Sequence, residues 1–307
     1  MWKEWIKPLV RPLPQWATVA VAAPQRLVTA TLHWDGQTAD VTADHTVASL
    51  YPLVIATSVD GGQRPVLEYR DRATGKRLGS LHLAQTTSIT IEQTTLTLYR
   101  VASGKHRCLP WPRRSWNAWL QNRQMEKNRP SNHFNMDKAG VQQLMIDYLC
   151  PRPVVLVSIA AQGHQNIFPM DLIGPLERSG FFSLALRSTN VSVPVMRDVR
   201  RVALSSVPAT MKADVYKLSA QHKQALQGWD ATSIPVRPSK EFGVPVVAAA
   251  LRIQELAIVH SQEVGLHTFF LGRIASDEKL ADGTQLHHTA GFHQAWRRRQ
   301  RVPLTEI

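Results

Sequence analysis

The chain has 307 residues, of which 36 are Lys or Arg and 23 are Asp or Glu, giving a net charge of +13, and 44% of its residues are hydrophobic. This length allows two ordinary domains with buried cores, and the basic excess is compatible with an anionic ligand or surface. Its two cysteines, Cys108 and Cys150, lie far apart in sequence, which argues against a disulfide framework or a cysteine metal site and favours a reducing compartment.

The beginning of the chain carries no targeting signal that we recognise. Residues 1–16, MWKEWIKPLVRPLPQW, are interrupted by prolines and charges and lack the continuous apolar core of a signal peptide. No apolar run in the sequence reaches the length needed to cross a membrane. We therefore expect a soluble protein of the cytoplasm without a transmembrane segment.

Residues 24–101 have the pattern of an all-β unit. Asp35 and Gly36 separate two predicted strands and form a typical hairpin turn signal. Residues 88–91 and 95–99 alternate apolar and polar side chains, as expected for sheets with one wet face. We predict a β-rich domain over residues 1–104, and nothing in it indicates a catalytic or metal-binding role.

Residues 105–135 form a basic, tryptophan-rich segment that we predict to be a linker. Its basic side chains alternate with Trp111, Trp116 and Trp119, and Glu126 is its only acid. Such a mixture can bind single-stranded nucleic acid or an anionic membrane surface. The alternative, which we favour, is an interdomain strap whose tryptophans pack on the neighbouring sheet, because no known nucleic-acid motif accompanies it.

A helix is predicted next, leading into a third segment over residues 136–307. Asn135 or Asp137 can cap this helix, whose apolar side chains have helical spacing, and Pro151 and Pro153 end it. The apolar side chains of its expected buried face are Val141, Leu144, Met145, Tyr148 and Leu149. A buried strand over residues 154–159 follows directly.

The turn after the third strand of this segment combines the groups that bind phosphate. Arg187, Ser188 and Thr189 precede a short helix in which Pro194 is expected at the first helical position and Ser192 as the N-cap. A cation, hydroxyls and free amides at a helix start can together hold one phosphate group. An ordinary capped helix with a solvent-facing arginine would have the same sequence.

Residues 143–299 resemble the flavin reductase-like, FMN-binding split-barrel family. The resemblance rests on the order of several short motifs and covers roughly half of the chain. In chain order they are DYLCPRPVVLVS (147–158), NIFPMD (166–171), LRST (186–189), VALSSV (202–207), KLSAQH (217–222) and GLHTFFLGRI (265–274). Residues 24–101 lie outside the resemblance.

This resemblance implies a mainly β protein in which a C-terminal FMN-binding split β-barrel with short helices follows a separate all-β domain. It also implies a homodimer with the flavin in a groove near the subunit boundary. Residues 169–173 would face the pyrimidine edge of the flavin. Its phosphate would be bound by Arg187, Ser188 and Thr189, and its ribityl chain would lie beside Ser205 and Ser206. The full set of expected cofactor-binding residues is Asn166, Pro169, Met170, Asp171, Leu172, Ile173, Leu186, Arg187, Ser188, Thr189, Ser192, Ser205 and Ser206. His267 corresponds to a histidine that often approaches the flavin or the nicotinamide, and the alternative is a structural barrel histidine.

The chain departs from the family pattern in two places. Asp171 replaces a common small hydroxyl residue, and a carboxylate there would lower the reduction potential of the flavin, so we expect its side chain to face solvent or a substrate amine. Gly265 and Leu266 replace the acidic residue that often precedes the histidine, which weakens the case for His267 as an oriented acid.

The sequence thus predicts an FMN-dependent oxidoreductase, with FAD as a possible alternative cofactor and NADH or NADPH as the co-substrate. A partner monooxygenase or another flavin acceptor is the expected recipient of reduced flavin. One alternative is a flavin-binding electron carrier or a substrate-specific flavoenzyme. Another is a nucleic-acid or anionic-membrane protein without a cofactor. We expect no metal at His287, His288 and His293, because no carboxylate or cysteine completes a ligand set.

Overall fold

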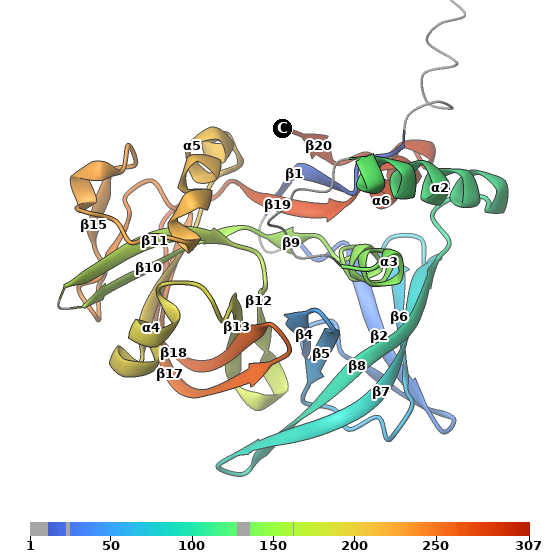
Figure 1. The fold of residues 1–307 in the computed structure, drawn as a ribbon, viewed down its shortest axis with the longest axis horizontal. Coiled ribbons are helices and arrows are strands. Elements are labelled where there is room, and N and C mark those ends of the chain that lie inside the picture. The colour runs from blue at the N-terminus through green and yellow to red at the C-terminus, as the bar shows by residue number, and fades with distance from the viewer. Residues whose placement is uncertain (1–11, 23–24, 128–135, 162) are drawn as a thin grey trace, which may run out of the picture.

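The computed structural model describes residues 12–22, 25–127, 136–161 and 163–307, and these residues form a mainly β structure (Figure 1). The predicted fold class, a mainly β protein in which a C-terminal β unit follows a separate N-terminal β region, is confirmed. The cap candidate Asn135 lies outside the described residues, whereas Asp137 caps its helix by accepting the N–H of Gly140 at 2.6 Å.

The N-terminal unit is an antiparallel sheet whose strands follow the order β3-β2-β6-β7-β8-β5-β4. Its strands are β2 (Val28–Trp34), β3 (Gln37–Asp40), β4 (His45–Leu50), β5 (Leu53–Thr57), β6 (Val66–Asp71), β7 (Arg77–Ile91) and β8 (Thr94–His106). The predicted hairpin turn joins β2 to β3, with positive φ values of 42° at Asp35 and 76° at Gly36. This two-residue turn fits the right-handed twist of the strands that it joins.

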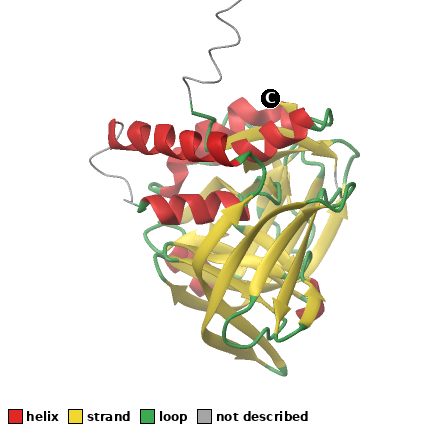
Figure 2. Cartoon of the chain, turned by 90° about the vertical axis from the view of Figure 1, so that its right-hand side faces the viewer, coloured by secondary structure: helices red, strands yellow, loops and turns green. Residues whose placement is uncertain are grey.

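The segment predicted as a linker contains a long helix, α2 (Trp111–Lys127), followed by α3 (Lys138–Asp147). The two helices and α6 (Gly291–Arg299) gather at one end of the molecule, above the strands (Figure 2). The side chains of Trp111, Trp116 and Trp119 on α2 are 70%, 47% and 44% exposed. More than two fifths of each tryptophan is therefore exposed, so their expected packing on the neighbouring sheet is at most partial.

The C-terminal unit is a second antiparallel sheet in the order β11-β10-β14-β17-β18-β13-β12. Its strands are β10 (Val155–Ala161), β11 (His164–Met170), β12 (Ile173–Leu176), β13 (Phe181–Arg187), β14 (Arg201–Ser206), β17 (Arg252–Val264) and β18 (His267–Lys279). Short helices, 3-10 turns and one hairpin complete this unit. The helices are α4 (Val193–Val199) and α5 (Lys212–Lys217), and the hairpin consists of β15 (Val236–Pro238) and β16 (Pro245–Val247). The 3-10 turns are η1 (Glu177–Ser179), η2 (Ala209–Met211), η3 (Leu218–His222) and η4 (Trp229–Ala231).

A small third sheet connects the two ends of the chain. It has the order β20-β1-β19-β9, formed by β20 (Thr305–Glu306), β1 (Trp16–Ala22), β19 (Thr284–Ala290) and β9 (Arg152–Pro153). The pairing of β1 with β19 runs from Trp16 opposite Ala290 to Ala22 opposite Thr284. The pairing of β1 with β19 therefore joins residues 1–104 to residues 136–307. The division of the chain into residues 1–104, 105–135 and 136–307 stays a prediction.

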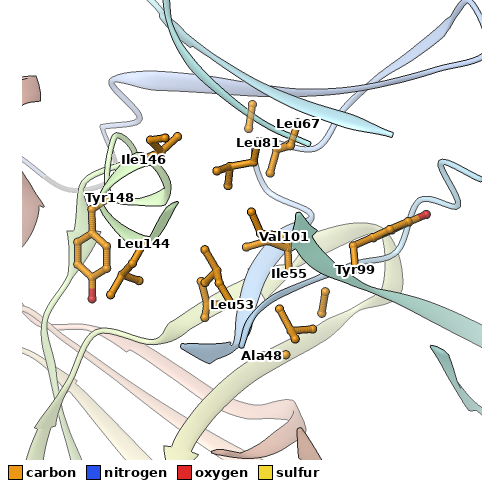
Figure 3. Packing of buried hydrophobic residues seen from close by; sticks show 14 of the residues in the cluster. Ala48, Leu53, Ile55, Leu67, Leu81, Tyr99, Val101, Leu144, Ile146 and Tyr148 are labelled. Carbon is orange, nitrogen blue, oxygen red and sulfur yellow. The ribbon is translucent and has the colours of Figure 1, made fainter. Parts of the chain in front are cut away.

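One continuous apolar core spans the N-terminal sheet, α3 and one side of the C-terminal sheet. Figure 3 shows Leu144 and Ile146 of α3 beside Leu53 and Leu81 of the N-terminal unit. Burial of a leucine or isoleucine side chain stabilises a fold by about 1.5–3 kcal/mol. The helix therefore holds the two β units together.

Candidate functional site

The turn between β13 and α4 presents three consecutive exposed polar side chains, those of Arg187, Ser188 and Thr189. Arg187 ends β13, opposite His267, the first residue of β18. The Ser188 hydroxyl lies 3.1 Å from the Thr268 hydroxyl, and the Ser188 N–H donates to the carbonyl of Leu266 at 3.1 Å. The turn is thus fixed to the β17–β18 hairpin while its cation and hydroxyls remain at the surface.

The expectation of free amides at the start of α4 is not met at residues 191–193. The N–H groups of Val191 and Val193 donate to the carbonyls of His222 and Asn190, and the Ser192 N–H donates to Asn190 Oδ1 at 2.9 Å. Asn190 closes an Asx turn that satisfies the Ser192 amide, and main-chain carbonyls satisfy the other two. The exposed side chains of the turn are therefore the donors that a phosphate at the surface would meet first.

Ser192 does not act as a side-chain cap, although it occupies the N-cap position as expected. Its hydroxyl is fully buried, accepts a hydrogen bond from Asn166 Nδ2 at 2.9 Å and lies 3.2 Å from His164 Nε2. Asn166 also donates to the carbonyl of Gln221 at 2.8 Å. These two residues of the predicted cofactor set therefore connect β11, α4 and η3 beneath the turn, and they do not line its surface.

The predicted pyrimidine-edge segment, residues 169–173, includes a bend between two hydrogen-bonded ladders. Met170 is the last β11 residue paired with β10, and Ile173 is the first β12 residue paired with β13. Asp171 and Leu172 lie between these pairs, and the carbonyl of Leu172 accepts from the N–H of Ala185 at 3.0 Å. A bend outside both ladders is where main-chain groups can meet a ligand.

Asp171 turns inward, which corrects the expectation that it faces solvent or a substrate amine. Its Oδ2 accepts a hydrogen bond from the Tyr148 hydroxyl at 2.8 Å and lies 2.7 Å from His288 Nδ1. Burial alone would raise the pKa of Asp171, but the contacts with His288 and Tyr148 bring that pKa below its ordinary value. The carboxylate is thus held ionised by these two contacts, with 20% of its side chain exposed.

The two serines at the end of β14 have different surroundings. Ser205 is fully buried, and its hydroxyl accepts the N–H of Val247 at 3.1 Å. Ser206 lines a cavity between the two β units. Leu186, Met170, Leu172 and Ile173 are buried, so any contact of theirs with a ligand would be through the main chain or one face of the side chain.

His267 lies against the N-terminal unit and is only 2% exposed. Its Nδ1 lies 3.3 Å from the hydroxyl of Ser49 and accepts the N–H of Leu50 at 3.4 Å. Burial, reinforced by the charge of Arg187, lowers the pKa of His267 to about 4. The ring is therefore neutral at physiological pH, with its proton on Nε2 when Nδ1 accepts.

Three residues near the site escaped the sequence analysis, namely Ser49, Asn190 and His222. His222 Nδ1 lies 3.0 Å from Asn190 Nδ2, so η3 is fastened to the β13–α4 turn. Asn190 could have been found, because Asn two residues before a helix-capping position commonly forms an Asx turn. Ser49 and His222 make contacts across 218 and 32 residues of sequence, and no local pattern announces such contacts.

Comparison with known proteins identifies the C-terminal unit. The family model described as "Flavin reductase like domain" matches residues 148–295. These residues form a flavin reductase-like domain. The match begins at Tyr148, so the N-terminal unit, α2 and all of α3 lie outside it.

Solved structures with a similar fold are also found. NADH:FAD oxidoreductase SgcE6 from Streptomyces globisporus C-1027 is 19% identical, with a TM-score of 0.44, over 53% of this chain and 96% of that chain. An FMN-binding protein from Thermus thermophilus is 20% identical, with a TM-score of 0.38, over 42% and 72%. A flavoredoxin from Methanosarcina acetivorans is 13% identical, with a TM-score of 0.37, over 42% and 69%. No curated protein shows a significant match to the sequence. The assignment of the domain rests on the family model.

No described helix has both the length and the apolar character needed to span a bilayer.

Proposed function

We propose that the protein is an FMN-binding oxidoreductase that takes reducing equivalents from NADH or NADPH. The observation that carries this proposal is the exposed cluster of Arg187, Ser188 and Thr189 within the flavin reductase-like domain. A guanidinium and two hydroxyls supply the donors that a phosphomonoester accepts. FAD would place its first phosphate at the same cluster.

The side chains of this turn fit a flavin phosphate, although the amides of residues 191–193 are already occupied. Arg187 and Thr189 would bind the phosphate, and Ser188 would be oriented by its contact with Thr268. The bend at Asp171 and Leu172 would offer main-chain groups to the pyrimidine edge of the ring. Asn166 and Ser192 would support the turn from below, because they are buried and bonded to each other. Ser205 and Ser206 remain the proposed ribityl side.

When bound, flavin supplies the capacity to accept a hydride from a reduced nicotinamide and to pass it on. The protein's part is to position the two ring systems and to exclude water. His267 cannot serve as a protonated acid at neutral pH, because it is neutral above about pH 4. We propose that it acts as a neutral contact for flavin or nicotinamide and that Ser49 and Leu50 fix its orientation.

A second candidate function keeps the flavin but changes the reaction. The β4–β5 hairpin of the N-terminal unit packs on His267, so it covers the position at which a nicotinamide is expected. This contact favours an electron carrier or an enzyme for one specific organic substrate over a general flavin reductase. In either case we propose a homodimer in the cytoplasm, and for the reductase a partner monooxygenase or other flavin acceptor.

A third candidate is a protein that binds anionic surfaces or nucleic acid without cofactor. It is favoured by the exposed aromatic face of α2, where Trp116 stacks on Trp119 at 4.8 Å and Arg123 lies 5.0 Å from the Trp119 ring. This candidate predicts steeply salt-dependent binding to anionic vesicles or single-stranded nucleic acid.

Steady-state kinetics distinguish these candidates. The proposed reductase oxidises NADH or NADPH in air when FMN or FAD is added, at a rate above that of free flavin. Binding of FMN without such turnover would favour the carrier or substrate-specific enzyme. A colourless protein that binds neither flavin in calorimetry would contradict both, and salt-dependent vesicle binding would then support the third candidate.

A further inference from the structure

The two large β sheets have the same strand order. The N-terminal sheet runs β3-β2-β6-β7-β8-β5-β4, and the sheet of the flavin reductase-like domain runs β11-β10-β14-β17-β18-β13-β12. Counted along the chain within each sheet, both orders are second, first, fifth, sixth, seventh, fourth, third. Two of the pairings, first with fifth strand and fourth with seventh, join strands that are not consecutive, and both sheets have them. Because most neighbouring strands in sheets are consecutive, these shared crossings indicate one fold present twice.

The hairpins of the two sheets also agree in detail. The sixth and seventh strands are joined by two residues in each sheet, residues 92–93 in one and 265–266 in the other. Each of these long hairpins contains two register shifts, which bend a sheet. In the first hairpins, Gly36 and Gly163 have positive φ values of 76° and 72° just before the second strand. The two sheets therefore turn and bend at corresponding places.

The two copies of the fold pack against each other through corresponding strands. Strand β4, the third of its sheet, contacts β12, the third of the other, and lies beside β13 (Figure 1). Thr46 and Gly174 are the second residues of these strands, and a Cβ atom at Gly174 would lie 3.5 Å from Thr46 Oγ1. The seventh strand β18 contacts β4, and its counterpart β8 contacts η1, the turn after β12. Contact between equivalent positions is expected where two like units pack about a two-fold axis.

The copies differ at the connection from the fourth to the fifth strand. In the flavin reductase-like domain, residues 188–200 continue the polar turn and form α4, whereas residues 58–65, all of them described, contain no helix. Asp60 lies in this shorter connection, where its Oδ1 accepts the N–H of Gly62 at 3.0 Å and the Tyr99 hydroxyl at 3.3 Å. A carboxylate at this place repels a phosphate. The N-terminal copy therefore lacks the group of donors proposed to bind FMN.

The contact between the copies is buried. Thr46 and Ser183, whose hydroxyl oxygens lie 2.9 Å apart, are 1% and 0% exposed. Ala48 of β4 belongs to the same apolar core as Leu176 and Phe181 of the other copy. Apolar contacts of this kind are typical of permanent subunit interfaces. Here both sides of the interface belong to one chain, so this face is closed to a second chain.

We propose that the N-terminal unit is a second copy of the flavin reductase-like fold without a flavin site of its own, and that it takes the place of a second subunit, so that one chain forms one complete flavin site. The part that concerns FMN rests on the function proposed above. The share of the N-terminal copy in that site is the β4–β5 hairpin, which contacts His267. A homodimer of whole chains forms through another surface, and FMN binding does not depend on it.

A pair of cysteines tests the packing within one chain and needs no flavin. The hydroxyl oxygens of Thr46 and Ser183 are close enough for sulfur atoms at these positions to bond. We expect mild oxidation of the double variant Thr46→Cys, Ser183→Cys to form a disulfide within the chain, seen on a non-reducing gel as a faster band of monomer mass. The two single variants are the controls and should form none. Disulfide-linked dimers, or no disulfide in the double variant, would overturn the proposal.

Sedimentation velocity with detection of flavin absorbance tests whether one chain forms a complete site. We expect one FMN per chain, with the flavin sedimenting with the monomer at low chain concentration and unchanged FMN affinity if a dimer forms at higher concentration. Two FMN per chain, or FMN bound only by a dimer, would overturn the proposal. No FMN binding at all would contradict the proposed function and the flavin part of this inference, whereas the disulfide test decides the packing independently.

Two matched variants test the difference between the copies. Arg64 is exposed in the connection that corresponds to the polar turn after Arg187. Arg187→Gln should weaken FMN binding at least about tenfold, since a hydrogen bond to a charged group contributes about 1.5–3 kcal/mol. Arg64→Gln removes the same charge from the N-terminal copy and should leave FMN affinity unchanged. Comparable weakening by Arg64→Gln would overturn the claim that this copy has no flavin site.

Discussion

The Nδ1 atom of His267 lies 3.3 Å from the hydroxyl oxygen of Ser49, so the N-terminal β unit contacts the flavin reductase-like domain at the histidine that family resemblance singles out. The ring is enclosed and neutral, with its pKa lowered to about 4. This contact makes the N-terminal unit part of the candidate site.

The state of His267 predicts how the reaction depends on pH. Because the pKa of the ring is lowered to about 4, His267 in the folded protein is neutral at pH 5.5 and at pH 8. The rate of NADH-dependent FMN reduction should therefore have the same pH dependence near pH 6.5 in the natural protein and in His267→Gln. Initial rates of both proteins across this range test the prediction, and a step near pH 6.5 confined to the natural protein would contradict it.

The buried pair of Asp147 and Arg152 should be essential for stability. Both side chains are nearly inaccessible, and Asp147 also accepts from Tyr69. Asp147→Ala leaves an unpaired buried guanidinium and should lower the free energy of unfolding by about 3–5 kcal/mol. Urea unfolding of the single variant and of Asp147→Leu combined with Arg152→Met measures this cost.

The double variant serves as the control, because it removes both charges and should recover most of the loss. Equal destabilisation by the single and double variants would show that packing, and not the unpaired charge, accounts for the effect.

His106 should make the protein less stable in acid. Its ring stacks on Phe292 with centroids 3.9 Å apart, and burial lowers its pKa to about 4. The unfolded chain, with an ordinary histidine pKa near 6.5, binds the proton more readily, so stability is complete above about pH 6.5 and is lost as the pH falls toward 4. The loss at pH 5 is on the order of 2 kcal/mol for one such histidine.

The variant His106→Phe should keep the stack and remove the titration. Its midpoint of thermal unfolding should exceed that of the natural protein by more at pH 5 than at pH 7.5. Parallel pH dependence of the two proteins would contradict the assignment. His267, His287 and His293, whose pKa values burial also lowers, would leave part of the acid sensitivity in place.

A fragment of residues 136–307 should fail to fold cooperatively. The apolar face of α3, with Leu144, Ile146 and Leu149, packs in the core shared with the N-terminal sheet, and β19 would lose its pairing with β1. Exposed apolar surface of this kind favours aggregation. Size-exclusion chromatography and thermal unfolding of the fragment test this, and a monodisperse fragment with a sharp transition would contradict it.

Local signals in the sequence accounted for much of the fold. The Asp35–Gly36 turn, the Asp137 cap and the alternating strands were predictable because each depends on neighbouring residues. Strand β1 was not predicted, because its partner β19 lies more than 260 residues away and no local pattern indicates that pairing. Helix α2 was interpreted as a linker, because its prolines and charges gave no apolar stripe.

The candidate site was predictable in part, for the same reason. The polar turn at Arg187, Ser188 and Thr189 is contiguous in sequence, and the structure shows its side chains exposed together. The inward orientation of Asp171 depends on Tyr148 and His288, which reach it from distant segments. The Val191 amide is occupied by the carbonyl of His222, which belongs to η3 and is placed there by the fold and not by the neighbouring sequence.

The central claim is that the β13–α4 turn binds the phosphate of FMN through Arg187. Fluorescence titrations with FMN and with riboflavin, which lacks the phosphate, test this claim most directly. The titrations compare the natural protein with Arg187→Gln and with the control Arg100→Gln, which changes an exposed arginine of β8. Loss of a charge-assisted contact of about 1.5–3 kcal/mol should weaken FMN binding at least about tenfold in Arg187→Gln, with riboflavin affinity unchanged and the control unaffected. Equal affinities for FMN and riboflavin in the natural protein, or an FMN affinity untouched by Arg187→Gln, would contradict the claim.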